Sequence, residues 1–192
     1  MRRRSGPTNQ PIASAAQPPR GGLPLRFFLI FAVSFLLGFF LLVTPEVKPA
    51  VLQFSRGLVN ASASLINVCG GAAKVDGDQR TILRDPRRGL GVEMKDGCNG
   101  VNITILLWSA VLAFPASWVR RVQGLLIGSA AIQGINLVRF ISLFYLLQYN
   151  RPLFDFAHEY LWESLIMLDA VVVFWLWAQR AVRARTASHV PA

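Results

Sequence analysis

Apolar runs alternate with polar segments along this chain, and four of the runs are long enough to be membrane-spanning helices. Spans are predicted at about 25–43, 101–118, 124–147 and 161–177. An α-helix rises 1.5 Å per residue, so about 20 apolar residues cross the ~30 Å hydrocarbon core of a bilayer. The pattern therefore predicts an all-α integral membrane protein, a single domain over residues 25–180 built as a bundle of about four transmembrane helices.

The first run, 25–43, also has the character of a signal-peptide core, which is the alternative interpretation. Its Phe-rich end is followed directly by Thr44-Pro45, which is a poor cleavage site. We therefore expect a retained membrane helix.

Segment 44–100 has a different pattern. Apolar and polar side chains are interleaved over 48–70, which predicts an amphipathic helix ended by Gly70-Gly71. This helix would lie on the membrane surface or pack across the mouth of the bundle. The hydrophilic stretch that follows carries the turn signal Val75-Asp76-Gly77-Asp78, with short strand candidates at 81–83 and 90–94. A small β-hairpin region outside the membrane is expected.

Charge then orients the bundle. The chain of 192 residues has a formal net charge of +10 and is 53% hydrophobic, and its arginines flank the apolar runs. They form no stripe on a soluble domain, which argues against nucleic-acid binding. Both tails and the link after the second span are basic and lack acidic residues, so the positive-inside rule places both termini in the cytoplasm. Residues 1–24 are predicted to be a disordered tail, 181–192 a second basic tail, and 44–100 an extracytoplasmic segment.

Arg139 is a charged residue within an apolar run. Its insertion costs at least about 2.5–3.5 kcal/mol, which makes it a candidate functional residue. Gln133, Asn136 and Arg139 recur every three residues and should form one polar stripe facing the bundle interior. The alternative is a snorkelling arginine, or a structural ion pair with a carboxylate near the fourth span (Asp155, Glu159 or Glu163).

Cys98 lies in a polar elbow, Asp96–Gly100, directly before the second span. The thiolate is the reactive form of cysteine, and a helix N-terminus beside a cation stabilises that anion. Gly97 and Gly100 leave room for a substrate backbone. The alternative is a disulfide with Cys69, because the outer compartment is oxidising.

His158 is predicted to begin the fourth helix on the same outer face, with Asp155 placed to cap the helix N-terminus. An imidazole is the usual general base for a thiol, although a lone interfacial histidine is more often an ordinary loop residue. His189, in the C-terminal tail, is expected to be a bystander. Together, Cys98, Arg139 and His158 match the general pattern of nucleophile, charge stabiliser and base.

These residues resemble three motifs of the exosortase/archaeosortase membrane proteins. The motifs are Asp-Gly-Cys-Asn-Gly around Cys98, Asn-Leu-Val-Arg-Phe ending at Phe140, and His158-Glu159. The resemblance covers about residues 27–180, and the short length looks most like exosortase H, a compact bacterial subtype. More usual members read Cys-Ser-Gly where this chain has Cys98-Asn99-Gly100, and larger members have about eight spans.

The resemblance implies a cysteine protease or transpeptidase of the bacterial inner membrane. Such an enzyme cleaves C-terminal sorting signals (a short motif, a transmembrane helix and a basic tail) at the outer face and transfers the product to an envelope acceptor of unknown identity. Cys98 would be the nucleophile, His158 the proton shuttle, and Arg139 an oxyanion stabiliser or a substrate-binding group. Supporting or substrate-positioning roles would fall to five further residues (Asn99, Gly100, Asn136, Asp155 and Glu159).

Within that set, Asp155 or Glu159 would orient the imidazole and Asn136 would position the guanidinium. The expected partners are the lipid bilayer and membrane proteins bearing the signal, with no cofactor, metal or nucleic acid. Two other functions stay open. One is a non-catalytic membrane scaffold or assembly factor with a Cys69–Cys98 disulfide. The other is a small transporter, which the absence of an internal repeat disfavours.

Overall fold

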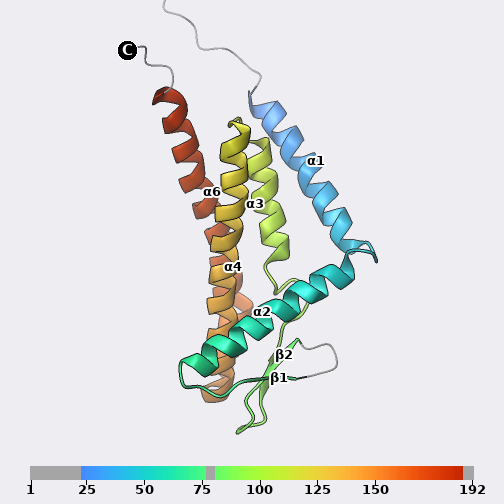
Figure 1. Cartoon of the computed structure of the whole chain (residues 1–192), viewed down its shortest axis with the longest axis vertical. Helices are drawn as coiled ribbons and strands as arrows, with labels where there is room; N and C mark the ends of the chain where they lie inside the picture. The colour runs from blue at the N-terminus through green and yellow to red at the C-terminus, as the bar shows by residue number, and fades with distance from the viewer. Residues whose placement is uncertain (1–22, 77–80, 188–192) are drawn as a thin grey trace, which may run out of the picture.

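The computed structural model describes residues 23–76 and 81–187. The upright helices of the bundle are α1 (Leu23–Val43), α3 (Val101–Ala113), α4 (Trp118–Tyr149) and α6 (Trp162–Ala187). The helix α2 (Lys48–Val68) crosses one end of the bundle (Figure 1). Residues 1–22 of the predicted N-terminal tail, Gly77-Asp78 of the predicted turn, and His189 lie outside the described residues.

Large apolar side chains cover the outside of the bundle. Leu25 is 77% exposed, Phe40 67%, Leu126 68% and Val171 63%. A water-soluble surface rarely presents so much contiguous apolar area, whereas lipid tails solvate it readily. Three helical stretches are long and apolar enough to cross a bilayer: Leu25–Val43, Trp118–Tyr149 and Arg151–Arg183. The prediction of a helical membrane protein is confirmed.

The second predicted span is shorter than expected. α3 has 13 residues and ends at Ala113 instead of residue 118, so it covers only about 20 Å. Pro115 explains the end: a proline disfavours helical geometry at the residue before it, and Phe114 is extended, with φ −71° and ψ 135°. α4 then begins at Trp118, six residues before its predicted start.

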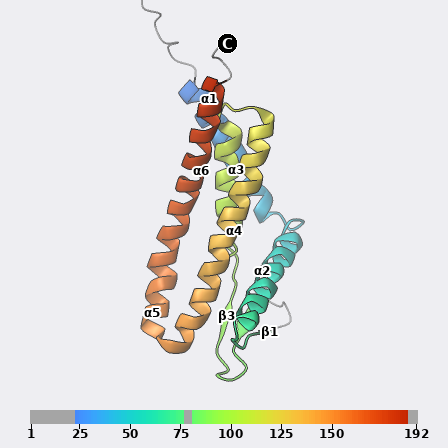
Figure 2. The ribbon, with the colours of Figure 1, turned by 60° about the vertical axis from the view of Figure 1, so that its left-hand side comes forward.

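The last two apolar runs form an antiparallel pair, α4 and α6, which meet at the end of the bundle that carries the sheet (Figure 2). Between them lie α5 (Arg151–Phe156) and a π-helical turn, η1 (Ala157–Leu161). The helical stretch therefore begins at Arg151 instead of 161 and continues through Ala187, beyond the predicted end at 177.

Asn150 is the N-cap of this stretch. Its side chain accepts a hydrogen bond of 3.0 Å from the Leu153 amide. The predicted cap, Asp155, lies inside the helix and pairs with Arg151 at 3.2 Å. Pro152, two residues after Asn150, lies in the first turn of α5, where proline is tolerated because the N–H that it lacks has no intrahelical partner.

The segment between α1 and α3 contains a helix and short strands, as the sequence predicts. α2 (Lys48–Val68) is the amphipathic helix, and three short strands form an antiparallel sheet in the order β1-β2-β3. The strands are β1 (Lys74–Asp76), β2 (Ile82–Arg84) and β3 (Gly91–Glu93), with Leu83 opposite Val92. The predicted amphipathic helix and β-hairpin region are confirmed.

Two separate apolar clusters hold the molecule together. The sheet-end cluster joins α2, the sheet and the last turns of α4, and its buried members include Val59, Ile66, Leu83, Val92 and Phe140. The mid-bundle cluster joins α3, α4 and α6 through Leu107, Val111, Ile132 and Ala170. The elbow that carries Cys98 links β3 to α3 and therefore lies between the two clusters.

Candidate active site

The elbow Asp96–Gly100 depends on two glycines with left-handed backbone. Gly97 has φ +91° and Gly100 has φ +73°, a region that costs an L-residue about 1–2 kcal/mol. Gly100 is also the N-cap of α3 and lies against α4. A Cβ there would be 3.1 Å from Gln133 Nε2 and 3.3 Å from Asn136 Nδ2. The missing side chain therefore allows the elbow to touch the polar stripe.

Asn99 fixes the elbow in place. The residue is 2% exposed, and its Nδ2 donates to Ser55 Oγ of α2 at 3.1 Å. Its Oδ1 accepts from the Val101 amide at 3.1 Å, at the first residue of α3. The side chain thus ties the amphipathic helix to the start of α3, which is a structural role. The sequence does not predict this role of Ser55, because a polar residue in an amphipathic helix is expected on the exposed face of α2.

Asn136 and Arg139 face the interior of the bundle, as the three-residue spacing predicted. They are 1% and 4% exposed. Arg139 Nη2 donates to Cys98 Sγ at 3.9 Å, so the structure joins two residues 41 positions apart. Among the described residues no carboxylate lies within ion-pair distance of this guanidinium.

His158 lies in the π-helical turn and does not begin a helix. Its ring stacks on Phe154 with centroids 5.7 Å apart and an interplanar angle of 23°. π-helical turns are rare and occur frequently at functional sites, because the extra residue re-aims nearby side chains. Periodicity in the sequence has no signal for such a turn.

A small pocket brings the three predicted residues together. Its lining comes from β3, the elbow, α4 and η1: Val92, Glu93, Cys98, Asn136, Arg139, Phe140, Leu143 and His158. Its volume of ≈ 10 Å³ is close to the minimum needed for one water molecule. Glu93 was not anticipated, since nothing in the sequence distinguishes it from other exposed strand residues.

The amide of Asn136 has no hydrogen-bond partner. Both Oδ1 and Nδ2 are buried and unpaired within the described part of the chain. Asn136 therefore makes no hydrogen bond to the Arg139 guanidinium among the described residues, and its role in positioning that group stays a prediction. An unsatisfied buried amide typically costs about 1–3 kcal/mol, and a hydrogen-bonding group that entered the pocket beside Asn136 would remove that cost.

The two carboxylates expected to orient the imidazole lie elsewhere. Glu159 is exposed, and Asp155 pairs with Arg151 on the outside of the helix. Neither lines the pocket. Glu93 is the acidic residue that does so.

Both cysteines are free thiols, with Cys69 exposed at the end of α2 and Cys98 partly buried. Over residues 23–76 and 81–187, no group of three or more His, Cys, Asp or Glu side chains has the arrangement of a metal site. The site as built offers a thiol, a guanidinium, an imidazole and an unpaired amide.

The model of one protein family, described as transmembrane exosortase, matches residues 21–177. That range includes the elbow, the polar stripe and His158. A search among curated proteins and a search among solved structures each found no match.

Proposed function

Because the chain belongs to the transmembrane exosortase family, we propose that it is a cysteine transpeptidase or protease that processes C-terminal sorting signals of other membrane proteins. One observation carries the proposal: Arg139 Nη2 approaches Cys98 Sγ to 3.9 Å in a pocket that His158 also lines. A nucleophile, a cation and a base within one pocket are the components that acyl transfer needs.

Cys98 is the proposed nucleophile. Its sulfur attacks the scissile carbonyl carbon, and the C–N bond then breaks to give a thioester on Cys98. His158 takes the thiol proton and delivers it to the leaving amine, which departs with the helix and basic tail of the signal. An acceptor nucleophile attacks the thioester, His158 removes the acceptor's proton, and the thiol forms again.

Arg139 and Asn136 have separate proposed roles. The Arg139 guanidinium stabilises the attacking thiolate, which the 3.9 Å approach supports. The Asn136 amide, buried and unpaired at the pocket wall, donates from Nδ2 to the oxyanion of the tetrahedral intermediate. A donor that gains its hydrogen bond only in that intermediate lowers the barrier without tightening ground-state binding.

The proposed location is the bacterial inner membrane, with both termini in the cytoplasm and the pocket on the outer side. The basic ends of α4 and α6 support this orientation. The substrate's helix would lie beside the bundle, with its cleavage motif at the level of the elbow. The acceptor is an envelope molecule that presents a nucleophile.

The test is co-expression of the chain with a tagged substrate that ends in a motif, a hydrophobic helix and arginines. We expect Cys98→Ala to abolish the processed product and Cys98→Ser to leave little of it. Cys69→Ala is the matched control, because it removes the other thiol, and it should process normally. Processing by Cys98→Ala at the wild-type rate would rule out the proposed nucleophile.

Thiol labelling separates the enzyme from the scaffold alternative. The scaffold requires a Cys69–Cys98 disulfide, whereas both thiols are free in the structure. A maleimide reagent should label both positions without prior reduction. Labelling that appears only after reduction would favour the scaffold.

A further inference from the structure

A second cavity lies at the opposite end of the bundle, between α3, α4 and α6. It has a volume of ≈ 490 Å³, within the range of about 300–1,000 Å³ typical of small-molecule sites. Its floor is formed by Gly124, Gly128 and Ala131 of α4, and Val173 and Trp177 of α6 form part of its wall. The mechanism proposed for Cys98 uses none of these residues.

Two glycines of α4 allow close helix packing beside this groove. A Cβ at Gly124 would come within 2.4 Å of Trp177 Nε1, and one at Gly128 within 2.5 Å of Leu107 Cδ2. α4 is therefore in contact with α6 at Gly124 and with α3 at Gly128, and the groove lies beside these contacts. It is a fixed feature of the helix packing.

The groove has the depth of one lipid leaflet. Its lining on α4 runs from Arg120 to Ala131, which is about 16 Å along the helix axis. That length is about half of the ~30 Å hydrocarbon core. A transmembrane helix of another protein would need a groove along the whole core, whereas one acyl chain needs half.

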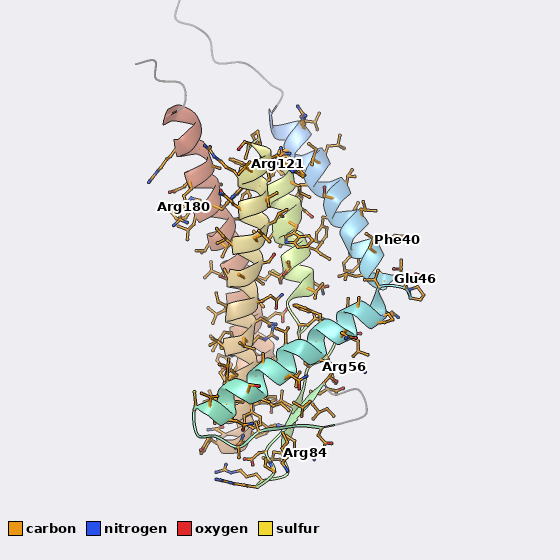
Figure 3. All side chains as sticks on the ribbon, viewed as in Figure 1. Phe40, Glu46, Arg56, Arg84, Arg121 and Arg180 are labelled. Carbon is orange, nitrogen blue, oxygen red and sulfur yellow. The ribbon has the colours of Figure 1, made fainter. Side chains whose placement is uncertain are left out.

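Two arginines stand at the mouth. Arg120 Nη1 donates to the Ala181 carbonyl at 2.9 Å, and its own carbonyl accepts from Trp177 Nε1 at 3.0 Å. Arg180 also lines the groove and is exposed. Figure 3 shows Arg180 and Arg121 toward the end of the bundle where α1 begins and α6 ends, whereas Arg56 and Arg84 lie toward the opposite end.

Among the described residues, no acidic side chain lines the groove to balance these two guanidinium groups. A phosphate offers the planar guanidinium two oxygens at once, and basic pockets between membrane helices commonly hold anionic headgroups. We propose that the groove binds one anionic phospholipid, with an acyl chain along Gly124–Ala131 and its phosphate at Arg120 and Arg180. A helix with a basic tail would instead bring further positive charge to this mouth.

The test compares two exposed arginines on the same helix. Arg180 lines the groove and Arg183 does not. The full-length chain is purified in detergent with phosphatidylglycerol or phosphatidylcholine, and retained lipid is counted by native mass spectrometry. We expect one retained phosphatidylglycerol per chain, with weaker retention of phosphatidylcholine. Arg180→Gln should lower phosphatidylglycerol retention about tenfold, and Arg183→Gln should leave it unchanged.

A second variant tests the acyl-chain part. Ala131→Phe keeps both arginines but fills the inner end of the groove, so it should also lower phosphatidylglycerol retention. Equal losses in Arg180→Gln and Arg183→Gln would overturn the proposal in favour of diffuse charge attraction. Displacement of the lipid by inorganic phosphate alone would overturn it in favour of a free-anion site. Dimers that disappear with Ala131→Phe would assign the groove to a second copy of the chain.

Discussion

Glycine has opposite uses at the two ends of this bundle. At the sheet end, Gly97 and Gly100 provide left-handed backbone that aims Cys98 at α4. At the other end, Gly124 and Gly128 are ordinary helical residues whose missing side chains bring Trp177 and Leu107 close. The first pair shapes a polar pocket and the second pair shapes a packed interface.

The buried polar groups at the two ends of the bundle differ in whether they have hydrogen-bond partners. Near the elbow, Asn136 and Arg139 are buried, and Asn136 has no partner at all among the described residues. Between α4 and α6, the Trp177 indole is paired with the Arg120 carbonyl. A membrane bundle can thus hold unsatisfied polarity at one end because close helix packing stabilises the other.

The largest effect should come from removing the buried charge. Arg139→Gln should lower signal processing by about 10³-fold, because the thiolate loses its cation. The fold should persist, since Arg139 has no ion-pair partner within residues 23–76 and 81–187. The measurement is the ratio of processed to unprocessed substrate over time, with thermal unfolding in parallel. Arg151→Gln, an exposed arginine at the same end, is the control, and equal losses in the two variants would contradict the assignment.

Asn136→Leu should separate activity from stability. Processing should fall about 10²-fold because the oxyanion loses its donor. The unfolding midpoint should stay the same or rise, since the variant removes an unpaired buried amide. Gln133→Leu, one turn deeper on the same stripe and outside the pocket lining, should process normally. If both variants lost stability to the same extent without a difference in processing, the amide would be structural.

A substitution at the contact between α4 and α6 should change the free energy of unfolding. Gly124→Ala places a methyl group against Trp177, and overpacking of this kind costs about 1–3 kcal/mol. Gly134→Ala is the matched control, because nothing lies within 4 Å of the Cβ position there. The control should be neutral or stabilising by up to about 1 kcal/mol. Unfolding in mixed micelles measures the difference, and identical midpoints would show that the contact is not tight.

Two glycines of the sheet end provide the smallest test. Gly100→Ala and Gly89→Ala both force alanine into left-handed backbone, at φ +73° and +71°, and each should cost about 1–2 kcal/mol. Only Gly100 touches Gln133 and Asn136, whereas nothing lies near the Cβ position of Gly89. Processing should therefore fall severalfold in Gly100→Ala alone. A matching loss in Gly89→Ala would indicate general destabilisation.

Much of the fold follows from local rules. Hydropathy predicts α1 and the cores of α4 and α6, and interleaved polarity predicts α2. The prediction placed the end of α3 too late, although Pro115 is a signal for a helix end. Proline is tolerated inside membrane helices, and the apolar run continues past Pro115. The Asn150 cap was also missed, in favour of Asp155, although Asn150 and Pro152 together are a helix-start signal.

The sequence predicts the main residues of the site better than it predicts the contacts between them. The free-energy cost of a charged side chain in the membrane indicates Arg139 without any tertiary information. The three-residue spacing of polar side chains likewise indicates the stripe to which it belongs. The 3.9 Å distance between Arg139 Nη2 and Cys98 Sγ results from the packing of α3 against α4. Glu93, Ser55 and the unpaired state of Asn136 depend on how the sheet and α2 close over the elbow. Those contacts join distant segments and leave no periodic trace in the sequence.

The π-helical turn Ala157–Leu161 acts as a phase break in an otherwise continuous helical rod. One additional residue in a helical turn rotates everything on one side of it by about 100° relative to an uninterrupted α-helix. His158, which lies in this turn, therefore lines the pocket, while α6 beyond the turn exposes apolar side chains such as Leu168 and Val171. The turn thus lets one continuous helical stretch serve two surfaces that a regular helix would present at a different angle to each other.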